Sequence, residues 1–487
     1  MGLSLRALHA AGVSFHLDDF HSLYHAQNTD TSSFWSRLLE DNHPPLSFLV
    51  LAAFRFLGGE NPLWLRTPNL IYAGLSFFLT WRIAKDLHSA LPNARARNVS
   101  LWGPAFLALS SLHIELTTDL RMYGLLALAS TGLFHALLRA LQGRGRAQPR
   151  GLSVWLPIAL WTGVGLHTHY HFVHVLALLS PLSAFLFWRA QRLRCLLLGL
   201  GAGVLLSLPW YVLCFPQQLG HGLAPGGSTV TLKTLLEGLA HLIFFRVSLA
   251  PEPLHTLLIG ASVAAFLGAV FGVFSLWRLS LSEPEDKQTT PQRSALYLFA
   301  TLAFLLPAWT ALVAYLIPRA GYEWRYLAAA IAPFCLLFAQ VASSRYGKLL
   351  ATGVLIAALV NAGLVVRAPG REDYLNAARF LESQYRSGDG LLAADWQPRI
   401  FPHGIGWRYY GERVSDGRAK DWPQLEHTKD FQLARPKALE KHPRVLCILR
   451  SIPGHMPFLK RLRETYRKEE SHAFGTSVFV LIFSNEP

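Results

Sequence analysis

The sequence predicts a mainly α-helical, polytopic membrane bundle followed by a small α/β domain. Of the 487 residues, 52% are hydrophobic and only 15% are charged, whereas a soluble chain carries charge on about a quarter of its residues. The apolar residues form long blocks separated by short basic stretches, which is typical of membrane proteins. From about Arg367 onward the pattern changes to the short apolar runs of β-strands.

Ten apolar segments reach or approach the length of about 20 residues that a helix needs to cross the hydrocarbon core. The segment 99–114 is the weakest of them, and the shorter block from Pro45 to Gly58 predicts a helix lying in the interface. The ten segments lie near 66–85, 99–114, 122–141, 152–168, 171–188, 194–214, 255–279, 295–317, 326–344 and 348–366.

The distribution of Lys and Arg predicts which loops face the cytoplasm. One set of alternate loops holds sixteen of these residues and the opposite set, between spans, holds five. We therefore expect an extracytoplasmic first loop with an acidic motif and interfacial helices over 1–65, a helical bundle over 66–366, and a soluble extracytoplasmic α/β domain over 367–487. The membrane is expected to be a bacterial-type plasma (inner) membrane.

The N-terminal twenty residues match neither a signal peptide nor a span, because Arg6 and His9 interrupt a short apolar stretch. An exported first loop without a preceding helix predicts that a first span is missing from this chain. Export of a short N-terminal tail together with the first helical hairpin is the alternative.

The predicted C-terminal domain alternates helix and strand signals. Apolar spacing predicts a helix over Asp373 to Arg386, and a Gly-Asp-Gly turn precedes a short strand over Leu391 to Ala394. Buried strands are expected over Arg444 to Leu449 and Ser477 to Phe483.

Composition argues against two other classes of protein. The net charge of +15 would suit nucleic-acid binding, but the Arg residues stand at the ends of apolar blocks, so topology explains them and no nucleic acid is expected. The four cysteines have no metal-knuckle spacing, which argues against a zinc ribbon or a disulfide framework.

Conspicuous polar side chains gather in the loops assigned to the outer face, where ionisable groups at membrane depth tend to mark a site or an aqueous cavity. Simpler explanations remain open: an outer-loop Asp is often only solvated, and Arg at a span end often only anchors it. The pairs His21/His25 and His167/His171 have the i, i+4 spacing of a metal site, although interfacial histidines are commoner. The conspicuous residues are Asp18, Asp19, Glu40 to Pro45, Glu115, Asp119, Arg121, Tyr123, His167, His169, Tyr170, His171, His174 and Tyr322 to Tyr326.

An ordered set of motifs resembles the GT-C family of membrane glycosyltransferases, whose relatives include protein O-mannosyltransferases and lipid A aminoarabinose transferases. The resemblance extends over nearly the whole chain, although no single motif decides it. The matching stretches are Leu17 to Tyr24 (LDDFHSLY), Asn42 to Leu46 (NHPPL), Leu63 to Asn69 (LWLRTPN), Ser110 to Ile114, Asp119 to Leu126 (DLRMYGLL), Leu208 to Tyr211, Trp324 to Leu327 and Arg371 to Tyr374.

The resemblance implies transfer of a sugar from a polyprenyl-phosphate carrier to an extracytoplasmic lipid, glycan or protein, with inversion. A sugar phosphate needs only cations to take up charge on the leaving phosphate, whereas the acceptor hydroxyl needs a carboxylate base. The implied catalytic residues are Asp18 as base with Asp19 beside it, and Asp119 as an acceptor-orienting carboxylate. The implied phosphate- and substrate-binding residues are His43, Arg121, Tyr123, Arg325 and Tyr326. No cofactor is implied with certainty, and a divalent metal stays an open alternative.

The chain departs from the family pattern at its carboxylates. The family usually has Asp-Glu where this chain has Asp18-Asp19, and Glu where it has Asp119. Each change keeps the charge but shortens its reach. The main rival interpretation is a transporter or flippase for a lipid-linked substrate, which would show related halves and charged or broken helices at mid-membrane; a non-catalytic scaffold is a second.

Overall fold

The computed structural model of the chain forms two compact units, which are described separately. The first unit comprises residues 1–10 and 25–367, and the second comprises 11–24 and 368–487. The first predicted domain, 1–65, is therefore divided between the two units. The structure describes residues 1–27, 31–89, 100–142, 152–220, 230–244, 246–281, 297–316, 323–343, 345–368, 370, 372–394, 405–425, 437, 441–450 and 457–485.

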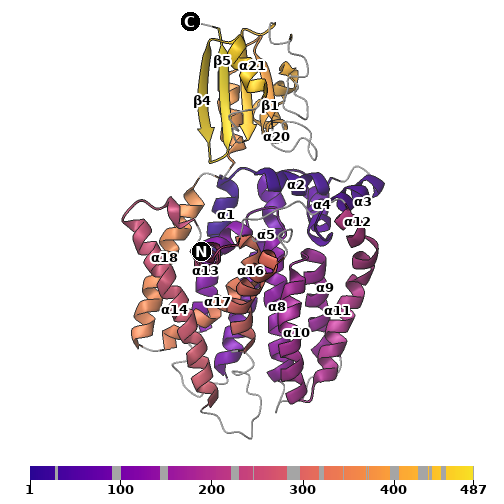
Figure 1. The fold of residues 1–487 in the computed structure, drawn as a ribbon, viewed down its shortest axis with the longest axis vertical. Coiled ribbons are helices and arrows are strands. Elements are labelled where there is room, and N and C mark those ends of the chain that lie inside the picture. Colours follow the sequence, from indigo (N-terminus) through magenta and orange to yellow (C-terminus); the bar gives the residue numbers. More distant parts are fainter. Residues whose placement is uncertain are drawn as a thin grey trace. The chain divides into compact units, whose positions relative to one another are not determined.

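The first unit is a bundle of helices, and α8 to α11 stand side by side in Figure 1. Helices α9 and α11 pack closely against each other, as do α5 and α8, and α6 and α17. The helices are α1 (Gly2–Gly12), α3 (Thr31–Glu40), α4 (Leu46–Gly58), α5 (Pro62–Ser89), α6 (Trp102–Leu109), α7 (Ser111–Leu116), α8 (Tyr123–Gln142), α9 (Leu152–Thr168), α10 (Phe172–Arg189), α11 (Leu193–Leu213), α12 (Phe215–Gly220), α13 (Leu232–His241), α14 (Leu254–Leu281), α16 (Leu306–Leu316), α17 (Ala328–Ala339) and α18 (Arg345–Arg367).

Seven helical segments of the described chain are long and apolar enough to cross a membrane. The predicted spans near 66–85 and 152–168 correspond to α5 and α9, which are helical but lie outside these seven. The protein is therefore an integral membrane protein with a helical bundle, as the sequence predicts. The seven segments are Tyr123–Leu141, Phe172–Arg189, Leu193–Leu213, Leu254–Ser275, Tyr297–Leu316, Trp324–Ala342 and Arg345–Arg367.

The predicted span at 99–114 is instead two short helices, α6 and α7, which meet at Ser110. Ser110 has a φ of −59° and a ψ of 112° and its side chain caps α7 by accepting from the His113 N–H. The buried guanidinium of Arg6 donates to the carbonyls of Leu107 (3.3 Å) and Ala108 (2.8 Å) at the end of α6. Helix ends leave such carbonyls without partners, so Arg6 stabilises a break that the apolar composition hides.

The amphipathic stretch 232–249 is helical in its first part, over α13. The chain then turns, and Arg246 takes a left-handed conformation with a φ of 54° before the 3₁₀ turn Val247–Leu249. Serines at the α6–α7 junction hold this turn, because the hydroxyls of Ser110 and Ser111 donate to the carbonyls of Leu242 (2.9 Å) and Ile243 (3.1 Å).

The second unit contains a five-stranded mixed sheet with the order β2-β1-β3-β5-β4. β1 pairs in parallel with β2 and β3, whereas β5 pairs antiparallel with β3 and β4. The small C-terminal α/β domain is thus confirmed, and β2, β4, α20 and α21 are elements that the sequence pattern did not predict. The elements are α2 (Leu17–His25), whose last residue belongs to the first unit, α19 (Tyr374–Gln384), β1 (Gly390–Ala394), α20 (Ile405–Val414), β2 (Gln424–Leu425), β3 (Arg444–Arg450), α21 (Pro457–Thr465), β4 (Lys468–Phe474) and β5 (Val478–Ser484).

Residues 11–24 pack into the second unit although about 350 residues separate them from it in sequence. Phe15 and Phe20 are buried, and their rings lie 5.3 Å and 5.6 Å from the ring of Tyr409. The Phe15 N–H donates to the Tyr410 hydroxyl at 2.6 Å, and the Leu17 N–H donates to Glu372 Oε2 at 2.7 Å. The segment with the acidic pair is therefore part of the core of the C-terminal domain.

Candidate functional site

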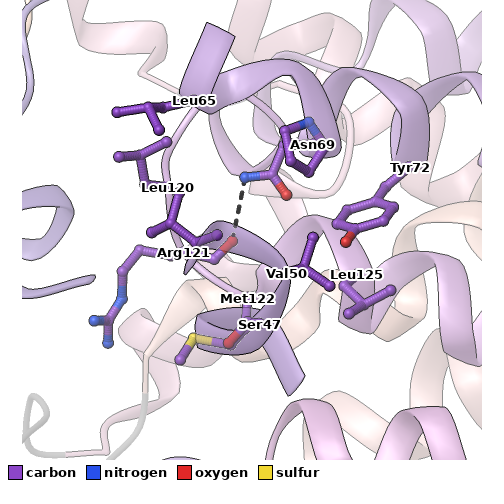
Figure 2. A pocket seen from close by; sticks show the side chains of 11 residues that line it. Ser47, Val50, Leu65, Asn69, Tyr72, Leu120, Arg121, Met122 and Leu125 are labelled. Atoms are coloured by element: carbon purple, nitrogen blue, oxygen red, sulfur yellow. Dashed lines mark hydrogen bonds between the residues drawn. The ribbon is translucent and has the colours of Figure 1, made fainter. Parts of the chain in front are cut away.

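Arg121 lies in the short connection between α7 and α8, and Asn69 of α5 fixes the backbone of that connection. The Asn69 side-chain amide donates to the carbonyl of Asp119 and, at 3.4 Å, to that of Arg121. The Arg121 side chain extends away from Asn69 and Tyr72, as Figure 2 shows. The residues in this figure line a pocket of only about 20 Å³, which holds about one water molecule. The Arg121 guanidinium therefore lies outside this pocket and contacts His43 instead.

His43 links Arg121 to a buried carboxylate. Its Nδ1 lies 3.1 Å from Asp41 Oδ2, and its Nε2 lies 3.4 Å from Arg121 Nη2. Because a guanidinium can only donate, the Arg121 contact requires the lone pair of Nε2, and Nδ1–H then donates to Asp41. Asp41 is almost fully buried, so it fixes the tautomer and the orientation of the His43 ring.

A polar brace holds the loop that carries His43. The Gln218 side-chain amide donates to the carbonyls of Leu38 (2.7 Å) and His43 (3.2 Å), and its oxygen accepts from the Tyr170 hydroxyl. The Trp210 indole N–H in turn donates to Tyr170 at 3.0 Å. The position of the His43 loop is therefore coupled to α11, α12 and the α9–α10 turn.

Aromatic and imidazole rings surround the same place. The ring of His169 lies 5.4 Å from those of His43 and Tyr123 and 5.5 Å from that of Tyr326. The ring of His171 stacks on Tyr326 at 3.7 Å. We call the set of His43, Arg121, Tyr123, His169, His171, Arg325 and Tyr326 the rim cluster.

Arg325, about 200 residues after Arg121 in the sequence, completes the rim cluster. Its guanidinium carbon lies 5.5 Å from the centre of the Tyr123 ring, a cation–π arrangement. Glu323 Oε2 approaches its Nε at 3.5 Å. The half-buried Arg325 and the buried Arg121 are thus two guanidinium groups that both act electrostatically on His169 and Tyr326.

The two central histidines of the rim cluster are uncharged at neutral pH. Burial, with the neighbouring His171, His43, Arg121 and Arg325, holds the pKa of His169 well below its ordinary value. Burial and the adjacent His174 and His43 lower the pKa of His171 to about 3. The positive charge of the rim cluster therefore resides on the guanidinium groups, while these imidazoles act as neutral polar groups.

An apolar groove lies beside His43 in the first unit. It has a volume of about 560 Å³ and is almost entirely apolar except for the ring of His167. Its walls come from α3, α4, α9 and α11, and they include Pro45 and Leu46, two and three residues after His43. The lining residues are Trp35, Pro45, Leu46, Leu49, Gly163, Val164, His167, Leu206, Pro209, Trp210, Leu213 and Cys214.

The acidic pair stands at the start of α2 in the second unit. Asp19 is fully buried, and its Oδ2 accepts from the His16 N–H at 3.3 Å, while its own N–H donates to His16 Nδ1 at 3.2 Å. Asp18 is only half-buried. Its charge interacts with Arg450, whose Nε lies 2.6 Å from Glu372 Oε1. Although burial alone lowers the pKa of Arg450, the Glu372 carboxylate, with lesser help from Asp18, raises it overall.

Asp119 lies two residues before Arg121 and its charge acts on Glu115 of α7. Glu115 is buried, with Arg246 Nη2 at 2.7 Å and His9 Nε2 at 3.5 Å. Burial raises the pKa of Glu115, but His9 and Arg246 outweigh it, so the net pKa is lowered. This buried ion pair connects α1, α7 and the turn before Val247.

The structure brings together one of the two predicted groups of site residues. His43, Arg121, Tyr123, Arg325 and Tyr326, expected to bind substrate, meet in the rim cluster. Asp119 is on the same connection as Arg121, whereas Asp18 and Asp19 lie in the second unit.

The two histidine pairs that were candidates for metal binding differ in their position in the fold. His21 and His25 are both on α2, whereas His167 and His171 do not lie on one helix. Helix α9 ends at Thr168, and His171 lies in the turn that follows. His167 lines the apolar groove and His171 stacks in the rim cluster. Tyr322 lies outside the described residues.

Sequence analysis missed several residues that shape the rim cluster. Asp41 and His169 stood out only as members of polar stretches, and Asn69 and Gln218 gave no signal of their own. A carboxylate two residues before a predicted phosphate-binding histidine was the one signal that sequence offered for Asp41.

Comparison with solved structures identifies the fold. The structure is similar to that of ArnT from Cupriavidus metallidurans bound to undecaprenyl phosphate, with a TM-score of 0.55 and 11% identity over 99% of this chain and 96% of that one. The chain has the GT-C fold. The GT-C helical bundle with a small α/β domain is thus confirmed.

Two other likenesses have lower scores. ArnT in the apo state matches with a TM-score of 0.42 and 13% identity over 91% of this chain and 88% of that one. An oligosaccharyltransferase from Archaeoglobus fulgidus, in a complex with Zn and sulfate, matches with a TM-score of 0.41 and 10% identity over 84% of this chain and 59% of that one. No protein-family model and no curated protein matches the sequence.

Proposed function

We propose that this protein is a membrane glycosyltransferase that moves a sugar from a polyprenyl-phosphate carrier to an acceptor outside the cytoplasm, with inversion. The observation that carries the proposal is the rim cluster, in which Arg121 and Arg325 meet His43, Tyr123 and Tyr326. The GT-C fold supports it, as does the undecaprenyl phosphate bound to the similar ArnT. The membrane is a bacterial-type plasma membrane in this proposal.

Two guanidinium groups suit the leaving phosphate of such a donor. Negative charge develops on that phosphate as the sugar departs, and preorganised cations stabilise it most strongly where water is excluded. Arg presents several donors in a fixed plane, which matches phosphate oxygens. His43, held by Asp41, accepts from one N–H group of Arg121 and thereby positions its guanidinium.

The apolar groove beside His43 suits the polyprenyl chain. Its volume of about 560 Å³ accommodates several isoprene units, and an apolar lining favours hydrocarbon over water. Pro45 and Leu46 lie in its wall, so a lipid in the groove has its phosphate end near His43.

Asp18 is the general base in this proposal. Asp18 is half-buried and can meet an acceptor hydroxyl, while Asp19, buried and bonded to His16, orients the start of α2. Asp119 orients the acceptor. Residues 11–24 share a core with 368–487, which supports a common side of the membrane for the acidic pair and the C-terminal domain, as the Lys and Arg count predicts.

The test is sugar transfer in a strain that lacks this protein and is complemented with the wild type, Asp18→Asn or Arg121→Gln. Mass spectrometry of envelope glycolipids and glycoproteins reports the product. We expect both variants to lose product by about 100-fold or more. The control, Arg82→Gln, alters a cation that pairs with Asp86 within α5 and should transfer normally. Full product from a folded Asp18→Asn protein would remove the base assignment, and an unchanged envelope in the deletion strain would contradict the proposed function.

A further inference from the structure

The α9–α10 turn fixes the proton of His169. The His171 backbone N–H donates to His169 Nδ1 at 3.0 Å. That bond uses the lone pair of Nδ1, so in the neutral ring the proton resides on Nε2. Burial and the nearby guanidinium groups keep the ring neutral, because they hold its pKa well below the ordinary value. His169 therefore presents an Nε2–H donor.

That donor has no acceptor within the described part of the chain. His169 is 4% exposed, and Nε2 is a buried atom without a hydrogen-bond partner. Buried N–H groups are nearly always bonded to protein, water or ligand. We therefore expect the His169 Nε2–H group to donate to an acceptor on a bound molecule.

The surroundings specify the charge of that acceptor. The guanidinium groups of Arg121 and Arg325 both act on His169, and its ring neighbours are His43, Tyr123 and Tyr326. A cation or another donor would be repelled here. An anionic oxygen would meet two positive charges and a neutral N–H, which together match the several oxygens of a phosphoryl group.

We propose that His169, through Nε2–H, donates a hydrogen bond to a phosphoryl oxygen of the polyprenyl-phosphate donor held between Arg121 and Arg325. This inference rests on the proposed function. His169 binds the phosphate without carrying charge itself. It orients the phosphoryl group, while the two guanidinium groups attract it.

The pair His169→Asn and His169→Gln tests the bond. Asn keeps an acceptor near the position of Nδ1 for the His171 N–H but has no donor at the ε position, whereas the Gln side-chain amide restores a donor there. The full-length protein in lipid nanodiscs is titrated with undecaprenyl phosphate, and the Kd is measured. We expect His169→Asn and His169→Ala to weaken binding about 10- to 100-fold and His169→Gln to remain within about fivefold of the wild type. The control His255→Gln, at a half-exposed histidine paired with Glu252, should bind as the wild type does.

Competition with inorganic phosphate distinguishes the sources of the phosphoryl group. Displacement of the lipid at millimolar phosphate, weakened in His169→Asn, supports recognition of the phosphate alone; no displacement, with the Asn effect on the lipid intact, supports recognition of the lipid phosphate. Wild-type affinity in a folded His169→Asn protein overturns the inference and leaves the proposed function standing, because a water then satisfies Nε2. Failure of the wild type itself to bind undecaprenyl phosphate contradicts the proposed function.

Discussion

The imidazole of His43 lies against the carboxylate of Asp41, with Nδ1 and Oδ2 3.1 Å apart. Asp41 thereby fixes which ring nitrogen faces Arg121, an arrangement in which a carboxylate sets the tautomer of a functional histidine.

Replacement of Asp41 should impair the proposed transfer without unfolding the protein. An Asp41→Asn amide has a similar size but accepts less strongly, so His43 is held less firmly and Arg121 is less well directed. We expect sugar transfer, measured with a radiolabelled lipid-linked donor in membranes, to fall about 5- to 10-fold. Glu60→Gln, at a more exposed carboxylate that pairs with Arg55, is the matched control. A wild-type rate in Asp41→Asn would show that His43 needs no such support.

Removal of the Arg6 guanidinium should destabilise the first unit. Arg6 donates to the carbonyls of Gly2 and Ala108, to the Thr117 hydroxyl and to His113 Nδ1, and Arg6→Met leaves these buried acceptors unmet. We expect a loss of about 3 kcal/mol or more, seen as a lower thermal midpoint in detergent. Arg189→Met, at an exposed Arg that ends α10, should change stability by less than about 0.5 kcal/mol. An equal effect of the two changes would refute the role of Arg6 at the α6–α7 break.

The buried Glu115 should make stability depend on pH in a defined direction. Its folded-state pKa is lowered from 4.5, against the raising effect of burial, by His9 and Arg246. Its ionised form therefore stabilises the fold above about pH 4.5, and that contribution is lost as the pH falls through the lowered pKa. The difference in thermal midpoint between the wild type and Glu115→Gln should be largest at pH 7 and should shrink toward pH 3.5. A difference that stays constant or grows on acidification would contradict this assignment.

Glu372 should hold residues 11–24 in the second unit. Its carboxylate accepts from the Leu17 N–H at 2.7 Å and from Arg450 at 2.6 Å, and the carbonyl of Glu372 accepts from Ser14. In Glu372→Gln the charge is lost, so we expect faster hydrogen exchange of the amides of 11–24, by about 10-fold or more. Glu382→Gln, at a surface carboxylate paired with Arg418, should leave that exchange unchanged. Unaltered protection in Glu372→Gln would assign the cohesion to Phe15 and Phe20 instead.

The sequence predicts features that depend on local composition. Long apolar helices such as α11 and α14, and strands such as β3 and β5, follow from hydrophobic pattern alone, since each is buried or lipid-facing along its whole length. The break at Ser110 does not follow, because the group that stabilises it, Arg6, is about 100 residues away.

The candidate site is predictable only in part for the same reason. The resemblance to a family brings His43, Arg121 and Arg325 into one hypothesis, and the structure gathers them. The place of Asp18 and Asp19 in the C-terminal core rests on contacts such as Leu17 with Glu372, across 355 residues, and periodicity carries no information about them. His169 requires knowledge of which ring nitrogen is already bonded, which only coordinates provide.

The insertion of Phe15 and Phe20 among Tyr374, Tyr409 and Tyr410 has a practical consequence for anyone who wishes to express the C-terminal domain by itself. A fragment that begins at residue 368 would expose the aromatic surface that Phe15 and Phe20 cover, and an exposed apolar surface of this kind favours aggregation. Grafting 11–24 onto that fragment through a flexible linker would cover that surface again, so the smallest autonomous version of this domain is assembled from two distant pieces of one gene.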